Sequence, residues 1–191
     1  MLKKALLGTA FSITLLSSIG CANTTHHINL DPSVELKSAQ LSNSHQIKVK
    51  VTNYLDKNIG SIDTAIHEHA DLLISNEIEE SIKSKISEGL TKLGYQLDKG
   101  ELPANLLTVD VTQLSYTTTT EALKTIAKLQ FNLKATLKSG NQTYSANYGS
   151  EVTDEYGSLP DQKKVEKSLN QLAGQTVNRL LNDSNIRILL K

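Results

Sequence analysis

The sequence contains one cysteine, no tryptophan and only two phenylalanines among its 191 residues. A single thiol excludes an intramolecular disulfide and the paired-cysteine spacing of a structural zinc site. With so few large aromatic residues, the hydrophobic core must be built from aliphatic side chains. Basic and acidic residues are equal in number, 20 of each, and form no basic cluster, which argues against nucleic acid as a partner.

The chain also lacks an apolar run of the roughly 20 residues needed to cross a bilayer. Its opening, "MLKKALLGTAFSITLLSSIGC", has a positive head at Lys3 and Lys4, and Ala5 to Leu16 is an apolar stretch. Small or modest residues follow, up to Gly20. This order is typical of a secretory signal peptide, and we expect residues 1–20 to be removed.

The only cysteine stands at the end of that segment, in "LLSSIGCAN". Gly20-Cys21 resembles the lipobox of bacterial lipoproteins, although Ser18 stands where that pattern prefers leucine. The resemblance implies cleavage between Gly20 and Cys21, a diacylglycerol thioether on Cys21, and a fatty acid such as palmitate on the new amine. Several acyl chains together give a stable membrane anchor. Ala22, rather than aspartate, follows Cys21, which resembles outer-membrane sorting in enterobacteria-like lipoproteins.

The remaining chain has the length of one domain. We expect residues 21–27 to be the acylated cysteine and a polar tether, and residues 28–191 to form a single periplasm-facing α+β domain. Alternating apolar residues predict strands at Ile47–Val51, Leu107–Val111, Lys128–Lys138 and Tyr144–Tyr148. The apolar positions change parity after Val111, which indicates a bulge near Gln113 or a strand covered on both faces. "IHEHADLLI" (66–74) is a further candidate strand, and "DKNIGS" (56–61) is predicted to be a turn.

Two amphipathic helices complete the prediction. Ile78, Ile82, Ile86 and Leu90 form one apolar stripe of a helix over 75–93, and Gly94 follows as its stop signal. The second helix is predicted to begin near Pro160 and to continue to about Leu180. The predicted fold class is α+β, an antiparallel sheet with two long helices packed on one face as a two-layer sandwich.

The segments placed in this way are similar to those of the YajG family of bacterial lipoproteins. The similarity rests on the lipobox, on "EGLTKLGYQL" and "LLTVDVTQLSY", on "AKLQFNLKATLKSGNQTYSANY", and on the ending "LLNDSNIRILL". It covers essentially the whole chain in the same order. It implies an envelope lipoprotein with one α+β domain, and it supplies no catalytic residues.

Two sequence patterns are candidates for a catalytic or metal-binding site. Glu151, Asp154 and Glu155 lie close together in "SEVTDEYG", and paired carboxylates are the machinery of glycoside cleavage, so a peptidoglycan-directed hydrolase is one alternative. An acidic solvated loop is the simpler interpretation. The serines have no nucleophile-elbow context, and no phosphate-binding glycine loop occurs.

The second pattern is "HEH", in which His67 and His69 would share one face of a strand. Such a pair can supply two ligands to Zn²⁺ or Cu²⁺, with His26, His27 or an acid as a third. The alternative is two surface histidines on a polar sheet face. We expect no resident cofactor or metal, and His67 and His69 are only weak candidates for one.

Lysines also recur on the polar sides of the predicted strands, at Lys48, Lys50, Lys128, Lys134 and Lys138. They can contact anionic lipopolysaccharide or peptidoglycan, although exposed strands often carry lysine simply as protection against edge pairing. Without a catalytic constellation, we expect a non-enzymatic binding or scaffolding lipoprotein at the outer membrane. Its partner would be an envelope protein, a lipid or peptidoglycan. We expect the protein to have no catalytic residues.

Overall fold

A computed structural model describes residues 24–36, 45–64, 68–101, 103–121, 124–157 and 161–190. The signal segment and Cys21 lie outside these residues. Within these residues the strands are β1 (Thr24–Ile28), β2 (Gln46–Asn53), β3 (Asn58–Thr64), β4 (Glu68–Ile74), β5 (Gln96–Leu97), β6 (Asn105–Glu121), β7 (Lys124–Ser139) and β8 (Gln142–Tyr156). The helices are α1 (Ile78–Lys92), α2 (Gln162–Leu181) and α3 (Ser184–Leu189).

The three long strands β6, β7 and β8 form an antiparallel meander that is the spine of the sheet. The other edge of β6 is shared by two consecutive strands. β2 pairs in parallel with its first half, over Lys48–Asn53, and β3 meets it in parallel further along, where Gly60 lies opposite Tyr116. β4 and then β1 extend the sheet from β3, and the two-residue β5 pairs with the start of β2.

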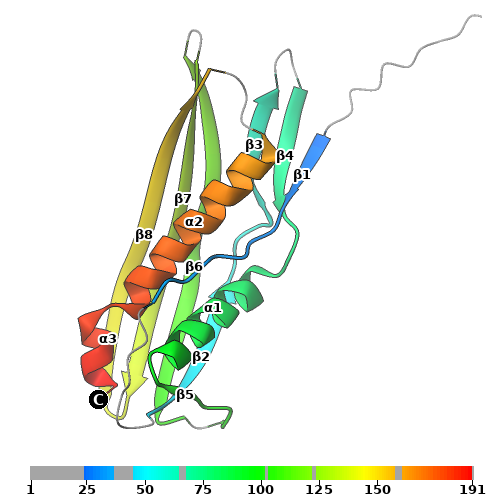
Figure 1. Cartoon of the computed structure of the whole chain (residues 1–191). Helices are drawn as coiled ribbons and strands as arrows, with labels where there is room; N and C mark the ends of the chain where they lie inside the picture. The colour runs from blue at the N-terminus through cyan, green and yellow to red at the C-terminus, as the bar shows by residue number, and fades with distance from the viewer. Residues whose placement is uncertain are drawn as a thin grey trace, which may run out of the picture.

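Figure 1 shows this sheet curling around α1 and α2. Helix α2 lies over β7 and β8 and reaches β1, and α1 lies over β2 and β5. The segment from residue 29 to residue 36, called the strap here, passes between the two helices. The arrangement is a half-barrel whose open side is filled by the helices and the strap.

The predicted fold class, a two-layer sandwich of an antiparallel sheet with two long helices on one face, is wrong. The sheet is mixed, because β1–β4, β2–β5, β2–β6 and β3–β6 are all parallel pairs. Strands dominate the fold, and α1 is shorter than predicted, beginning at Ile78. The sheet also curls into a half-barrel instead of forming one flat layer.

Local patterns explain most of the elements. Along β7, Leu129, Phe131, Leu133, Ala135 and Leu137 are buried while the residues that alternate with them are polar, as predicted. The bulge near Gln113 is confirmed, because the register of β6 against β7 shifts between Val111 and Gln113. The predicted turn over 56–61 is wrong in its second half, since β3 begins at Asn58.

The helix signals are also partly confirmed. The stripe of α1 is buried on the sheet, and Gly94 adopts a positive φ of 92° just after the helix. Helix α2 begins after Asp161, whose side chain accepts a 2.8 Å hydrogen bond from the Lys164 amide. The predicted start at Pro160 lies outside the described residues. Residues 24–27, which the sequence assigned to the tether, belong to β1.

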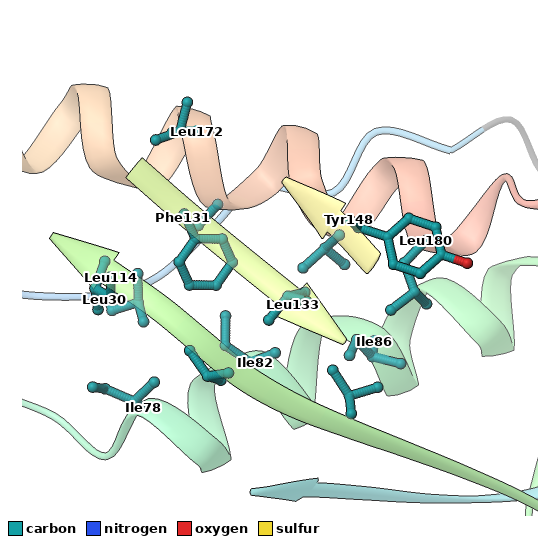
Figure 2. Packing of buried hydrophobic residues seen from close by; sticks show 14 of the residues in the cluster. Leu30, Ile78, Ile82, Ile86, Leu114, Phe131, Leu133, Tyr148, Leu172 and Leu180 are labelled. Atoms are coloured by element: carbon teal, nitrogen blue, oxygen red, sulfur yellow. The ribbon is translucent and has the colours of Figure 1, made fainter. Parts of the chain in front are cut away.

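The core is aliphatic, as the composition required. Figure 2 shows Ile78, Ile82 and Ile86 of α1 facing Leu114, Phe131 and Leu133 of the sheet, with Leu172 and Leu180 entering from α2. Leu30 of the strap is fully buried among them. Within the described residues no helix is long and apolar enough to cross a membrane.

Side-chain amides hold the strap in place where a neighbouring strand would otherwise do so. The Asn76 amide donates to the Leu30 carbonyl at 2.8 Å and accepts from the Leu30 N–H at 2.9 Å. On the other side, Asn170 donates to the Asn29 carbonyl at 2.8 Å and accepts from the Asp31 N–H at 2.7 Å. The Asn76 amide thereby pairs both backbone groups of the buried Leu30, and Asn170 holds the exposed residues on either side of it.

Candidate functional site

The acidic cluster of β8 is divided between the two faces of the sheet. Glu151 and Glu155 lie on the exposed outer face, whereas Asp154 points to the inner face. Glu151 pairs with Lys128 and Glu155 with Lys124, each at 3.0 Å. The strand period therefore keeps the three carboxylates from sharing one cleft, as glycoside cleavage requires.

The protonation equilibria of this cluster follow its contacts. The hydrogen bond from Lys128 lowers the pKa of Glu151, which keeps that carboxylate ionised rather than available as an acid. The Tyr156 hydroxyl donates to Asp154 Oδ2 at 3.2 Å. Burial, with the nearby Asp154 charge, raises the pKa of Tyr156 to about 12. Glu151 therefore lacks the raised pKa of a general acid.

The predicted metal site at His67 and His69 cannot be described, because His67 lies outside the described residues. His26 Nδ1 lies 3.1 Å from Gln162 Oε1, and the His27 carbonyl accepts from Gln162 Nε2 at 2.5 Å. Both histidines thus contact the beginning of α2. Among the residues that the structure describes, no group of three or more His, Cys, Asp or Glu side chains is placed to hold a metal ion.

The structure brings together lysines that are far apart in the sequence. On the outer face, Lys48 of β2 lies opposite Leu106 of β6, and Leu106 lies opposite Lys138 of β7. Lys50 and Lys134 occupy neighbouring positions on the same face of the same two strands. Because adjacent strands are about 4.8 Å apart, the two lysine-bearing strands are separated by only about 10 Å. We call Lys48, Lys50, Lys134 and Lys138 the lysine face.

The lysine face differs from the rest of the outer surface in its ion pairing. Lys124 and Lys128, toward the β6–β7 turn, are each paired with a glutamate of β8. Over the described chain, the ion pairs include none with Lys48, Lys50, Lys134 or Lys138. Lys48 Nζ instead donates to the Gly100 carbonyl at 2.7 Å. A single acid, Asp110, lies opposite Lys134, and it accepts a hydrogen bond from Thr52.

The lysine face lies at the end of the sheet away from β1. The strand pairings run from β1 through β4, β3 and β6 to β7. Along this path Thr24, the first residue of β1, lies level with Ala127 of β7. Lys134 and Lys138 are seven and eleven residues further along β7. At about 3.3 Å per residue, they lie roughly 23 and 36 Å from that level. The paired Lys128, by contrast, lies beside it.

Two grooves open on the surface of the described chain. One, of about 550 Å³, runs between the strap and α2 and is lined mainly by polar side chains, among them Ser33, Asn170, Gln175 and Asn178. The other, of about 330 Å³, lies at β2 and is bordered by Lys48 to Val51, by Glu80 and Lys83 of α1, and by Glu101. Neither groove presents a nucleophile beside a base.

The chain matches one protein family and several solved structures. A family model described as "Uncharacterized lipoprotein" matches residues 32–191. No curated protein matched the sequence. Among solved structures, protein XCC0632 from Xanthomonas campestris superposes with a TM-score of 0.54 at 12% identity, over 83% of this chain and 92% of that one. This similarity shows a shared fold.

Two further structures resemble the chain more loosely. A putative neuraminyllactose-binding hemagglutinin homolog from Helicobacter pylori has a TM-score of 0.44 at 13% identity, over 86% of this chain and 96% of that one. A minor lipoprotein from Acinetobacter baumannii has a TM-score of 0.40 at 10% identity, over 76% and 92%. Because the family model spans most of the chain, including every strand of the sheet except β1, the protein belongs to this family of bacterial lipoproteins.

Proposed function

We propose that the protein is a YajG-like lipoprotein, acylated at Cys21 with palmitate-type chains and anchored to the outer membrane. Its domain faces the periplasm and acts as a non-enzymatic binding module. The lipobox-like Gly20-Cys21 and membership of a lipoprotein family support the anchor. The division of Glu151, Asp154 and Glu155 between two faces of β8 weighs against a hydrolase that uses these acids.

The lysine face is the observation that carries the binding role. Four lysines stand on two strands about 10 Å apart across the sheet, and no carboxylate of the described chain forms an ion pair with them. A surface of this kind attracts a polymer that carries many negative charges, because each weak contact adds to the others.

The position of the lysine face favours peptidoglycan over the anchoring membrane. Only Ala22 and Asn23 separate Cys21 from β1, a span of roughly 10 Å when extended. The anchor would therefore hold the β1 end of the domain close to the lipid. With the sheet directed away from the bilayer, the lysine face stands roughly 23 to 36 Å further out, where an anionic polymer rather than headgroups is within reach.

Sedimentation with purified peptidoglycan sacculi tests this proposal. The full-length lipoprotein in detergent should pellet with sacculi at low salt and be released as salt screens the charges. Replacing all four lysines of the lysine face by glutamine should weaken binding about tenfold, since each exposed contact contributes about 0.2–1 kcal/mol.

A matched control removes the same charge elsewhere. Lys57, Lys83, Lys92 and Lys124 are equally exposed but already paired with glutamates, and their joint replacement by glutamine should leave sacculus binding within about twofold of the original. Equal losses in the two variants would show that only net charge matters. Tighter binding to anionic vesicles than to sacculi would identify the membrane as the partner, and release of soluble muropeptides would contradict the non-enzymatic role.

A further inference from the structure

Among the described residues, strand β2 has no neighbouring strand along most of one edge. β5 pairs with it only at Gln46 and Ile47, and the chain then departs at Asp98. Over Lys48–Asn53, one edge of β2 is bonded to β6. No strand among the described residues lies beside the other edge over this stretch, and we call this empty position the vacancy. The vacancy begins where β5 ends and is in line with it.

The backbone groups that face the vacancy can be identified. The Ile47 carbonyl accepts from the Asp98 N–H at 2.9 Å, so the polar groups of Ile47 point toward β5. Because backbone direction alternates along a strand, the N–H and C=O groups of Val49 and Val51 point the same way, into the vacancy. Within the part of the chain that the structure describes, these groups have no hydrogen-bond partner, as at the edge of a sheet.

The side chains around this edge are also incompletely covered. Val49 and Val51 are only partly buried, whereas Leu107 and Val109, which lie opposite them on β6, are fully buried. Tyr54, directly after β2, is 88% exposed, and Leu97, at the end of β5, is 42% exposed. Two of the three exposed large hydrophobic residues in the described chain therefore stand at the two ends of the vacancy.

Charge indicates what the edge accepts. The outward side chains of the vacant stretch include Lys48 and Lys50, while the groove beside it also carries Glu101 and Lys83, the latter paired with Glu80 at 3.5 Å. Pairing with a second copy of β2 would gather the lysines of both copies on one face, which opposes self-association. An incoming strand with acidic side chains on the lysine side and apolar side chains on the α1 side satisfies both faces.

We propose that the β2 edge binds an extended segment of a partner protein in which acidic and apolar residues alternate, by adding a strand to the sheet. The backbone of Val49 and Val51 supplies the hydrogen bonds. The inward apolar side chains of the guest complete the cover of the two valines, and its acidic side chains meet Lys48 and Lys50. This site shares Lys48 and Lys50 with the lysine face, but it differs from sacculus binding in using the backbone edge of β2, which lies in the plane of the sheet.

Titration with synthetic peptides tests the proposal on the full-length lipoprotein in detergent. A peptide of alternating valine and glutamate, long enough to span Lys48–Asn53, should bind, and its counterpart with lysine in place of glutamate should bind at least about tenfold more weakly. Val51→Pro removes one outward N–H without removing a bond to β6 and should weaken binding about tenfold. Val51→Ala keeps that N–H and should have the smaller effect.

Modified peptides give a test that leaves the protein unchanged. N-methylation at every second residue removes the N–H groups from one edge of the guest strand, and shifting the pattern by one residue removes those of the other edge. Only one of these two isomers should lose binding. Equal binding of both isomers, or of the glutamate and lysine peptides, would overturn the proposal. A concentration-dependent dimer abolished by Val51→Pro would replace the partner segment with a second copy of the chain.

Discussion

The hydroxyl of Tyr148, in β8, donates a 2.5 Å hydrogen bond to Oδ2 of Asp183, and the same carboxylate caps α3 through the Asn185 amide at 2.8 Å. Tyr144 adds a second hydroxyl to Oδ2 at 3.0 Å. One half-buried carboxylate therefore connects the end of the chain to the sheet. Burial raises the pKa of Asp183, but the hydrogen bonds from Tyr148, Asn185 and Tyr144 outweigh it and hold the pKa below its usual value.

A double-mutant cycle should detect this connection. Tyr148→Phe and Asp183→Asn should each lower the free energy of unfolding by about 1–3 kcal/mol at neutral pH, and together by less than the sum. Because the folded pKa of Asp183 is lowered, its stabilisation is present above the unfolded pKa, near 4, and is lost as pH falls through the folded value. Urea unfolding at neutral and acidic pH measures the coupling, and an exposed control, Tyr54→Phe, should change nothing.

At alkaline pH the buried tyrosines should limit stability. Burial is the largest cause of the raised pKa of Tyr95, Tyr116, Tyr148 and Tyr156. The unfolded chain ionises these residues near pH 10, whereas the folded chain keeps them neutral to higher pH. Stability is thus fully present below about pH 10 and decreases as pH rises above it. Ultraviolet absorbance of tyrosinate should show fewer ionised tyrosines before unfolding than after it, and simultaneous ionisation of all six tyrosines in the folded protein would contradict this.

The contact between α2 and the strap should not tolerate a methyl group. A Cβ built at Gly174 would lie 2.3 Å from the Ser33 carbonyl oxygen, which belongs to backbone and cannot rotate away. Gly174→Ala should therefore destabilise the protein by about 1–3 kcal/mol, despite the higher helix propensity of alanine. Gly157→Ala, where no atom lies within 4 Å of the added Cβ, is the matched control. Thermal unfolding of both variants checks the prediction, and equal melting temperatures would contradict the close approach.

The lipid anchor has a direct test in cells. Cys21→Ser removes the sulfur that would carry the diacylglycerol, so the protein should leave the membrane fraction or persist as an uncleaved precursor. Membrane fractionation, together with mass spectrometry of the N-terminal peptide, measures the outcome. Ser18→Leu would restore the preferred lipobox residue and should process at least as completely as the original. Unchanged processing and membrane association of the Cys21→Ser protein would refute the anchor.

Sequence patterns predicted the elements whose burial is local and periodic. The alternation of β7 and the four-residue stripe of α1 each reflect one face packed against the core, so the residues alone carry the signal. β3 was missed because its first residues, Asn58 and Gly60, are typical of turns. In the structure Gly60 is required by a close approach, since a Cβ there would collide with the Tyr116 backbone.

By itself the sequence determined an aliphatic core, the positions of most strands and helices, and a lone cysteine in a lipobox-like pattern that predicts a lipid anchor. Only the tertiary structure decided the direction and order of the strands, because parallel and antiparallel neighbours bury the same alternating residues. The same pairing placed Lys48 and Lys138 level with each other on either side of β6. It also left the β2 edge open. Such properties depend on which strands become neighbours, and that depends on contacts between residues far apart in the chain.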